Sequence, residues 1–157
     1  VVPDDDIVHD VDRIGSLIEH HRVTHVLMVP RLYRALIDRA APNLDSLSVV
    51  IVAGEECPAS LVQLHADQVG HAVLSNEYGP TEATVWATAH RLGAQDGGEP
   101  IGATIPGSTL RVVDPLLLQV PTGVAGELIN AGQGVTGGSL DDEATPAVTF
   151  VTADQEL

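Results

Sequence analysis

Asn76-Glu77-Tyr78-Gly79-Pro80-Thr81-Glu82 joins two apolar runs, at residues 71–74 and 83–90. Gly79-Pro80 predicts a bend between the runs, because glycine permits unusual backbone angles and proline fixes one. An amide, a phenol, a hydroxyl and two carboxylates surround that bend. A turn that only reverses the chain does not need so many functional groups, so this stretch indicates a site.

Helical patterns precede this stretch. Asp10 is a suitable N-cap for a helix over residues 11–22, which has one apolar face. Pro30 and Pro58 suit the first turns of two further helices, and Gly70 ends the last of them. Three helices are therefore predicted before the central stretch.

Three apolar runs separate these helices, at residues 23–29, 47–53 and 71–75. The first two are rich in branched residues and are typical of strands buried on both faces. The alternation predicts an α/β fold, a parallel sheet with flanking helices. Ligands of open α/β sheets bind where the carboxyl ends of the strands meet. Three segments are expected to lie at this edge: residues 28–30, 53–56 and 76–82.

The second part of the sequence has a different character. Residues 93–106 are rich in Gly and Pro and predict a long loop. Short strands are predicted at residues 109–113 and 126–131, with a turn at Pro121-Thr122-Gly123 between them and a helix only at 141–150. The expected subdomains are an α/β one over residues 1–100 and a small β-rich one over residues 101–157.

The composition narrows the class of protein. The 157 residues have a formal net charge of −15, and all seven basic residues are arginine. Without a basic patch, nucleic acid and anionic membranes are poor partners. Cys57 is the one cysteine, which suits a reducing cytoplasm. The histidines lack metal-ligand spacing, so zinc is not expected.

The order of residues 76–82 resembles the core signature of adenylate-forming enzymes, and within them the amino-acid adenylation domains of nonribosomal peptide synthetases. The resemblance covers essentially the whole chain and implies a middle slice of the large N-terminal domain. The stretches that support it are Val26-Leu27-Met28-Val29-Pro30 with Tyr33, Val52-Ala53-Gly54-Glu55, and Gly126-Glu127-Leu128 with Gly132-Gln133-Gly134-Val135.

In such an enzyme a carboxylate attacks the α-phosphate of ATP and releases pyrophosphate, with Mg²⁺ carrying much of the developing charge. The resemblance implies that the Thr81 hydroxyl contacts a phosphate and that the Glu82 carboxylate helps to hold Mg²⁺. The alternative for both residues is the first turn of a helix.

The resemblance also implies an adenine site, in which the Tyr78 ring lies against the base and Asn76 binds its amino group. Ala53-Gly54-Glu55 forms the other wall. Gly54 also suits a tight turn, and Tyr78 also suits an ordinary half-buried position. The implied nucleotide-binding residues are Ala53, Gly54, Glu55, Asn76, Glu77, Tyr78, Gly79 and Thr81.

A pocket for the acyl substrate is implied beside the adenine site. Its lining residues are Met28, Ile51, Ala53, Glu77, Val85 and Trp86. A carboxylate in an apolar pocket is costly unless it finds a donor. Glu77 therefore predicts a small-to-medium substrate side chain with a hydroxyl, amide or amine, unless Glu77 points to solvent.

The implied partners are an amino acid, a carrier-protein domain with its phosphopantetheine, and condensation domains of the same synthetase. The family also uses a lysine in an upstream loop, a downstream acid for the ribose and a catalytic lysine. This chain has no lysine, so we expect it to be inactive alone. Thr136-Gly137-Gly138-Ser139 also replaces the usual Ala-Arg-Gly-Tyr. An acyl-CoA-forming ligase and a non-catalytic nucleotide-binding remnant remain alternatives.

Overall fold

The structure, a computed structural model, describes residues 7, 10–93, 95–96 and 100–136. The chain forms two compact units. The sheet unit consists of Val1–Glu77 and Ala89–Gly102, and the hairpin unit of Tyr78–Thr88 and Ala103–Leu157. The central motif is thus divided after its second residue. The predicted division at residue 100 stays a prediction. It differs from these two units in where it places Tyr78–Thr88 and residues 101–102.

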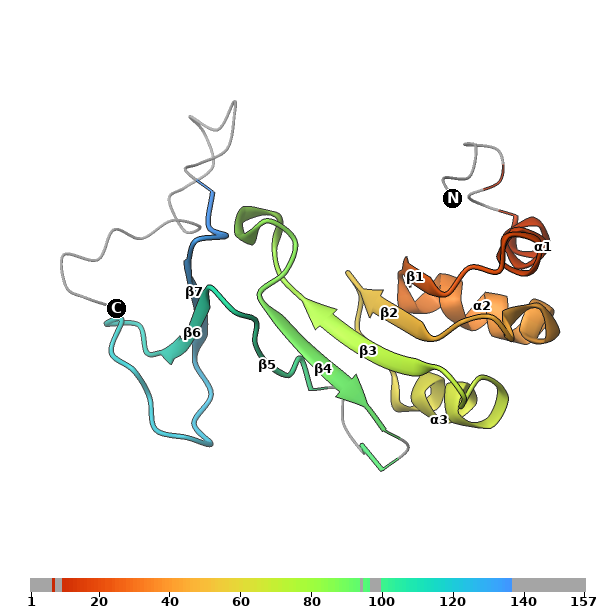
Figure 1. The fold of residues 1–157 in the computed structure, drawn as a ribbon. Coiled ribbons are helices and arrows are strands. Elements are labelled where there is room, and N and C mark those ends of the chain that lie inside the picture. The colour runs from red at the N-terminus through yellow and green to blue at the C-terminus, as the bar shows by residue number, and fades with distance from the viewer. Residues whose placement is uncertain (1–6, 8–9, 94, 97–99, 137–157) are drawn as a thin grey trace. The chain divides into compact units, whose positions relative to one another are not determined.

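Three α-helices form in the described part of the sheet unit (Figure 1). α1 (Val11–His21) begins at Asp10, whose carboxylate accepts hydrogen bonds from two backbone N–H groups of the first turn. α2 (Pro30–Ala40) has Pro30 in its first turn, and α3 (Ala59–Gln68) follows Pro58. The three helices predicted before the central motif are confirmed. A short 3₁₀ helix, η1 (Ala41–Leu44), follows α2.

The strands of this unit confirm the predicted α/β class. β1 (His25–Met28), β2 (Val49–Ala53) and β3 (Val73–Tyr78) are parallel neighbours in that order. β4 (Thr88–Leu92) lies beside β3 and runs in the opposite direction (Figure 1). The sheet is therefore mixed but mostly parallel.

β3 is longer than the sequence pattern predicted. The apolar run ends at Ser75, but pairing with β2 continues to the partners Ala53 and Glu77. Backbone N–H and C=O groups that find partners in a ladder extend a strand whatever their side chains are. The first residues of the central motif therefore belong to a strand, and the bend begins only after Tyr78.

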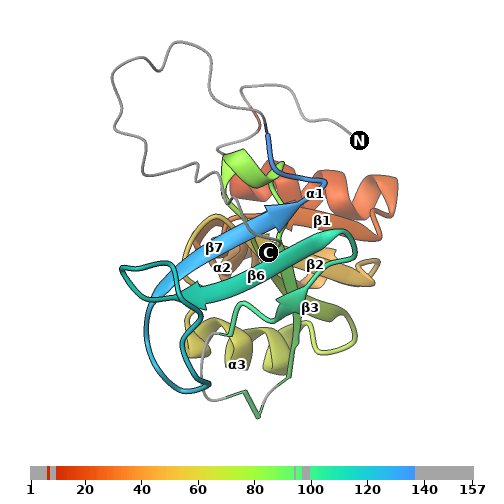
Figure 2. The same ribbon diagram turned by 90° about the vertical axis from the view of Figure 1, so that its left-hand side faces the viewer.

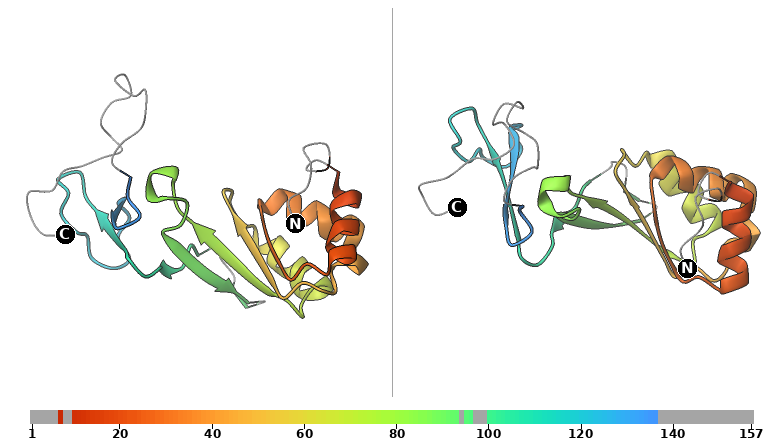
Figure 3. Two further views of the ribbon diagram at one scale, coloured as in Figure 1. Left: turned by 45° about the horizontal axis from the view of Figure 1, so that its top comes forward. Right: turned by 90° about the horizontal axis from the view of Figure 1, so that it is seen from above.

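α2 and α3 lie on the same side of the sheet (Figure 3). The core on that side contains Val50, Val52 and Leu74, which are at most 1% exposed. On the other face Leu27 is 55% exposed. The prediction that the first two strands are buried on both faces is wrong for the described residues, because an apolar run does not reveal which segment covers the second face.

The hairpin unit contains two antiparallel strands, β6 (Ser108–Val113) and β7 (Glu127–Gly132), shown in Figure 2. They confirm the two short strands predicted from the sequence. β5 (Ala103–Thr104) lies within the predicted loop at residues 93–106. The predicted helix at residues 141–150 lies outside the described residues. Among those described, no helix is long and apolar enough to cross a membrane.

Candidate functional site

The parallel register of the sheet unit places several predicted site residues at one edge. Met28, Val52 and Asn76 are aligned across β1, β2 and β3, and Ala53 is aligned with Glu77. Each of these residues lies at or near the carboxyl end of its strand. The strand pattern predicted that these residues lie together at the carboxyl edge of the sheet, and in this unit they do.

These edge residues occupy two faces of the sheet, because successive side chains of a strand point to opposite sides. Met28 packs against the helix-covered core, and Asn76 on the same face is 6% exposed. The Asn76 Nδ2 atom donates to the carbonyl oxygen of Pro100 at 3.1 Å. This bond fixes the amide, and its Oδ1 atom remains the acceptor that an adenine amino group requires.

The face that the helices leave uncovered holds a small group of aligned residues. Ile51 is aligned with Ser75, and Ala53 with Glu77. The Ser75 hydroxyl donates to the Glu77 carboxylate at 3.4 Å, and both side chains are half-buried. Glu77 thus has a local donor on an otherwise small and apolar surface. Sequence reasoning missed Ser75, although its spacing of two residues from Glu77 on a strand was a usable signal.

The turn after β2 has a conformation that requires its glycine. Gly54 has φ +82°, a left-handed value that favours glycine. Glu55 next to it forms an ion pair with Arg31, 3.0 Å between Oε1 and Nη2. Its Oε2 atom also accepts from the Arg31 N–H at 3.4 Å, at the start of α2. Glu55 therefore links the turn after β2 to the first turn of α2.

In the hairpin unit the second half of the motif folds back on itself. The N–H of Ala87 donates to the carbonyl of Tyr78 at 2.8 Å. A Cβ on Gly79 would lie 2.3 Å from the Val85 carbonyl oxygen, so only glycine fits there. Tyr78 is 39% exposed, so the motif leaves this residue partly open to solvent.

Thr81 and Glu82 lie in a single 3₁₀ turn, η2 (Thr81–Ala83). The alternative role of these two residues was the first turn of a helix, and the structure has a single 3₁₀ turn at this position. Thr81 is exposed and Glu82 is half-buried. The Glu82 carbonyl oxygen accepts from the N–H of Thr136 at 2.8 Å, and the Thr84 hydroxyl donates to the carbonyl of Gly134 at 2.6 Å. The glycine-rich stretch therefore holds the motif at Glu82 and the segment after the motif at Thr84, a residue that sequence reasoning missed.

The donor set fits a shared Mg²⁺ ion. The described residues contain no cluster of three or more His, Cys, Asp or Glu side chains that could hold a metal by themselves. Mg²⁺ usually takes one or two carboxylates beside phosphate oxygens. The η2 turn offers donors of this kind, the half-buried carboxylate of Glu82 and the exposed hydroxyl of Thr81.

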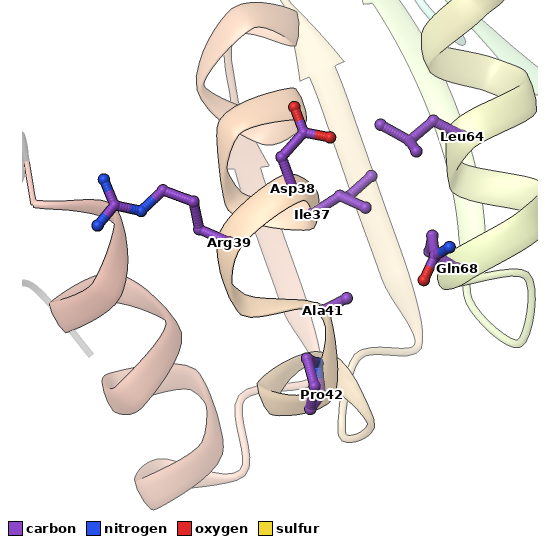
Figure 4. A pocket seen from close by; sticks show the side chains of 7 residues that line it. All are labelled: Ile37, Asp38, Arg39, Ala41, Pro42, Leu64 and Gln68. Atoms are coloured by element: carbon purple, nitrogen blue, oxygen red, sulfur yellow. The ribbon is translucent and has the colours of Figure 1, made fainter.

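Two other features of the sheet unit lie away from the motif. A hollow of about 260 Å³ lies beside α2 and α3 (Figure 4), and none of the predicted site residues lines it. A buried pair also joins these helices: the Tyr33 hydroxyl and His65 Nδ1 are 2.6 Å apart. Burial lowers the pKa of His65 and raises that of Tyr33. Neither feature includes a residue of the candidate site at the sheet edge.

An open α/β sheet with polar and small residues at its carboxyl edge is a ligand-binding arrangement. Comparisons with known proteins identify the family to which the chain belongs. The family model described as AMP-binding enzyme matches residues 1–140. The chain belongs to this family.

Its relatives include large synthases and peptide synthetases. The chain is 36% identical over 133 residues to a plipastatin synthase of Bacillus subtilis, covering 84% of this chain and 4% of that protein. It is 40% identical over 138 residues to phosphinothricin tripeptide synthetase PhsC of Streptomyces viridochromogenes, covering 88% and 12%. The chain therefore spans only a small part of these relatives.

Among solved structures, the AMPPNP-bound form of the nonribosomal peptide synthetase FmoA3 superimposes with a TM-score of 0.84. The sequences are 29% identical, and the match covers 91% of this chain and 16% of that one. The resemblance to synthetase adenylation domains is confirmed. The roles of the individual site residues stay predictions.

Proposed function

We propose that the chain is part of an amino-acid-activating domain of a nonribosomal peptide synthetase. The reaction joins an amino-acid carboxylate to the α-phosphate of ATP, forms an aminoacyl-AMP and releases pyrophosphate. The observation that carries the proposal is the register that aligns Met28 with Asn76 and Ala53 with Glu77 at one sheet edge. The AMPPNP-bound relative supports a nucleotide as one ligand.

The two faces of the edge suit two ligands. Ala53 and Glu77, with Ile51 beside them, present a small apolar surface with one carboxylate, which we assign to the substrate. Asn76 lies on the opposite, helix-covered face, and we assign its amide at the carboxyl end of β3 to the adenine. Met28 shares the Asn76 face and packs against the helix-covered core, opposite to Ala53 and Glu77.

The η2 turn supplies the groups for the phosphates. The Thr81 hydroxyl donates to a phosphate oxygen, and the Glu82 carboxylate helps to hold Mg²⁺. When bound, the ion neutralises phosphate charge as the carboxylate attacks. The carbonyl of Glu82 is tied to Thr136, so the turn is oriented before any ligand binds.

The proposal includes partners and a setting. Aminoacyl-AMP would pass its acyl group to a phosphopantetheine thiol on a carrier domain, and a condensation domain would use the thioester. These domains would belong to the same cytoplasmic synthetase. The chain itself has no lysine to contribute to catalysis, so we propose that it does not adenylate alone.

Exchange of radiolabelled pyrophosphate into ATP, dependent on an amino acid, tests the function in the longer synthetase chain. Glu82→Gln keeps the shape and removes the charge, and exchange should fall by about 100-fold. Asp45→Asn, an exposed carboxylate beside η1, is the matched control and should exchange normally. Normal exchange by a folded Glu82→Gln protein would refute the Mg²⁺ role. Exchange by the 157-residue chain alone would refute its predicted inactivity.

The substrate class follows from Glu77. An amino-acid panel with the longer protein should favour side chains with a hydroxyl, amide or amine over leucine and valine. Glu77→Ala should remove that preference, because it removes the carboxylate that would accept from the substrate in addition to its 3.4 Å contact with Ser75. If leucine or valine is already the best substrate of the wild type, Glu77 does not select.

A further inference from the structure

The segment after η2 adopts a strained conformation. Thr84 has φ +55° and ψ +48°, and Val85 has φ +76°. Both are β-branched residues in the left-handed region, which such side chains rarely occupy. Consecutive positions of this kind persist only where surrounding contacts determine them, and they cluster at ligand sites.

Contacts from two directions hold this turn in the hairpin unit. At its base, the Val85 carbonyl lies over Gly79, where no Cβ fits, and the N–H of Ala87 donates to Tyr78. At its tip, the Thr84 hydroxyl donates to the Gly134 carbonyl at 2.6 Å. A Cβ on Gly134 would lie 3.1 Å from the Ala83 carbonyl oxygen, so the close approach of the two segments favours glycine.

The turn determines which side chains face solvent. Ala83 and Ala87 are buried, whereas Val85 between them is 52% exposed and Trp86 is half-buried. An exposed apolar side chain makes few packing contacts. Packing of Val85 therefore does not offset the free-energy cost of its strained backbone. The family resemblance also implies that Val85 and Trp86 line the substrate pocket.

We propose that Thr84 is a positioning residue, whose hydroxyl bond to Gly134 fixes Val85 and Trp86 in the orientation that selects the amino-acid substrate. Thr84 itself does not touch the substrate. The selecting role rests on the proposed function, whereas the bond and its effect on the turn do not.

Thr84→Val tests the bond, because valine has the same shape and branching and lacks only the donor. Hydrogen exchange of residues 82–88 in the purified chain should become about fivefold faster, since one hydrogen bond is worth about 1 kcal/mol. Thr84→Ser keeps the donor and should exchange like the wild type. Thr122→Val, an exposed threonine in the β6–β7 connection, should leave residues 82–88 unchanged.

Protection of the β6 and β7 amides shows whether a variant has kept its fold. If Thr84→Val loses that protection, the smaller Thr84→Ala replaces it in the same comparison. Unchanged exchange of residues 82–88 in a folded donor-free variant overturns the proposal, because the bond would not hold the turn.

The second measurement uses pyrophosphate exchange in the longer synthetase chain. Thr84→Val should raise the KM for the amino acid about fivefold, with the KM for ATP unchanged and Thr84→Ser near wild type. An equal rise in both KM values overturns the selecting role. A wild type without any exchange refutes the proposed function and with it the selecting role, while hydrogen exchange still decides whether Thr84 holds the turn.

Discussion

Tyr33→Phe should destabilise the sheet unit by removing one buried hydroxyl. Tyr33 on α2 is fully buried, and His65 on α3 is 5% exposed. The His65 Nε2 atom lies 3.0 Å from the Ala72 carbonyl oxygen, which can only accept, so Nε2 carries the proton. Nδ1 is therefore the acceptor, and the Tyr33 hydroxyl donates to it at 2.6 Å.

The magnitude follows from what phenylalanine leaves behind. A buried acceptor without a donor costs about 1–3 kcal/mol. The ring cannot recover a partner by changing tautomer, because the Ala72 carbonyl would then lose its donor. Phenylalanine keeps the packing and avoids burial of a hydroxyl, which offsets part of the cost. We expect a net loss of about 1–2 kcal/mol, or about 5- to 30-fold faster exchange.

Native-state hydrogen exchange of the α2 and α3 amides measures this loss. Tyr78→Phe is the matched control, because it removes the same group from a side chain that is 39% exposed. Its effect should stay within about 0.5 kcal/mol. NMR titration supplies a second measurement: the pKa of His65 should rise in Tyr33→Phe, since the hydroxyl donates only to the neutral ring. Equal, small effects of both substitutions would refute the reasoning.

Three further predictions concern the sheet unit. Burial lowers the pKa of His65 below its ordinary value of 6.5. The contribution of His65 to stability is therefore complete above pH 6.5 and is lost as the pH falls through the pKa of the folded state. Urea midpoints of the wild type and of His65→Gln, compared across this pH range, test this. Gly15→Ala should cost about 1–2 kcal/mol, because its Cβ would lie 2.6 Å from the Cβ of Ala40; a urea midpoint equal to wild type would contradict this. The exposed apolar face around Leu27 predicts a broad thermal transition, and a sharp one in a monomeric sample would count against it.

Local signals in the sequence predicted the elements of the sheet unit well. Asp10 and Pro30 mark helix starts through chemistry that acts within one turn, and the structure has both. The parallel order of the strands followed from their alternation with helices. The exposure of Leu27 could not be predicted in this way. An apolar strand indicates that both of its faces are buried, but it does not indicate which segment covers each face.

The hydrogen-bond partners of the motif were harder to predict. Asn76 bonds to Pro100, and Thr84 bonds to Gly134, across long intervals of sequence. The left-handed turn at Thr84 also contradicts its local propensity, because tertiary contacts determine it. A conflict between local preference and structure is typical of functional and strained sites.

The position of the motif on a strand explains how one short stretch can serve two ligands. Because β3 alternates its side chains, Asn76 and Glu77 are adjacent in sequence but lie on opposite faces. The aligned partners of β2, Val52 and Ala53, separate in the same way. A shift of one residue in this register would exchange the two faces and place the carboxylate in the helix-covered core. The β2–β3 pairing therefore keeps the proposed adenine contact and the proposed substrate contact apart.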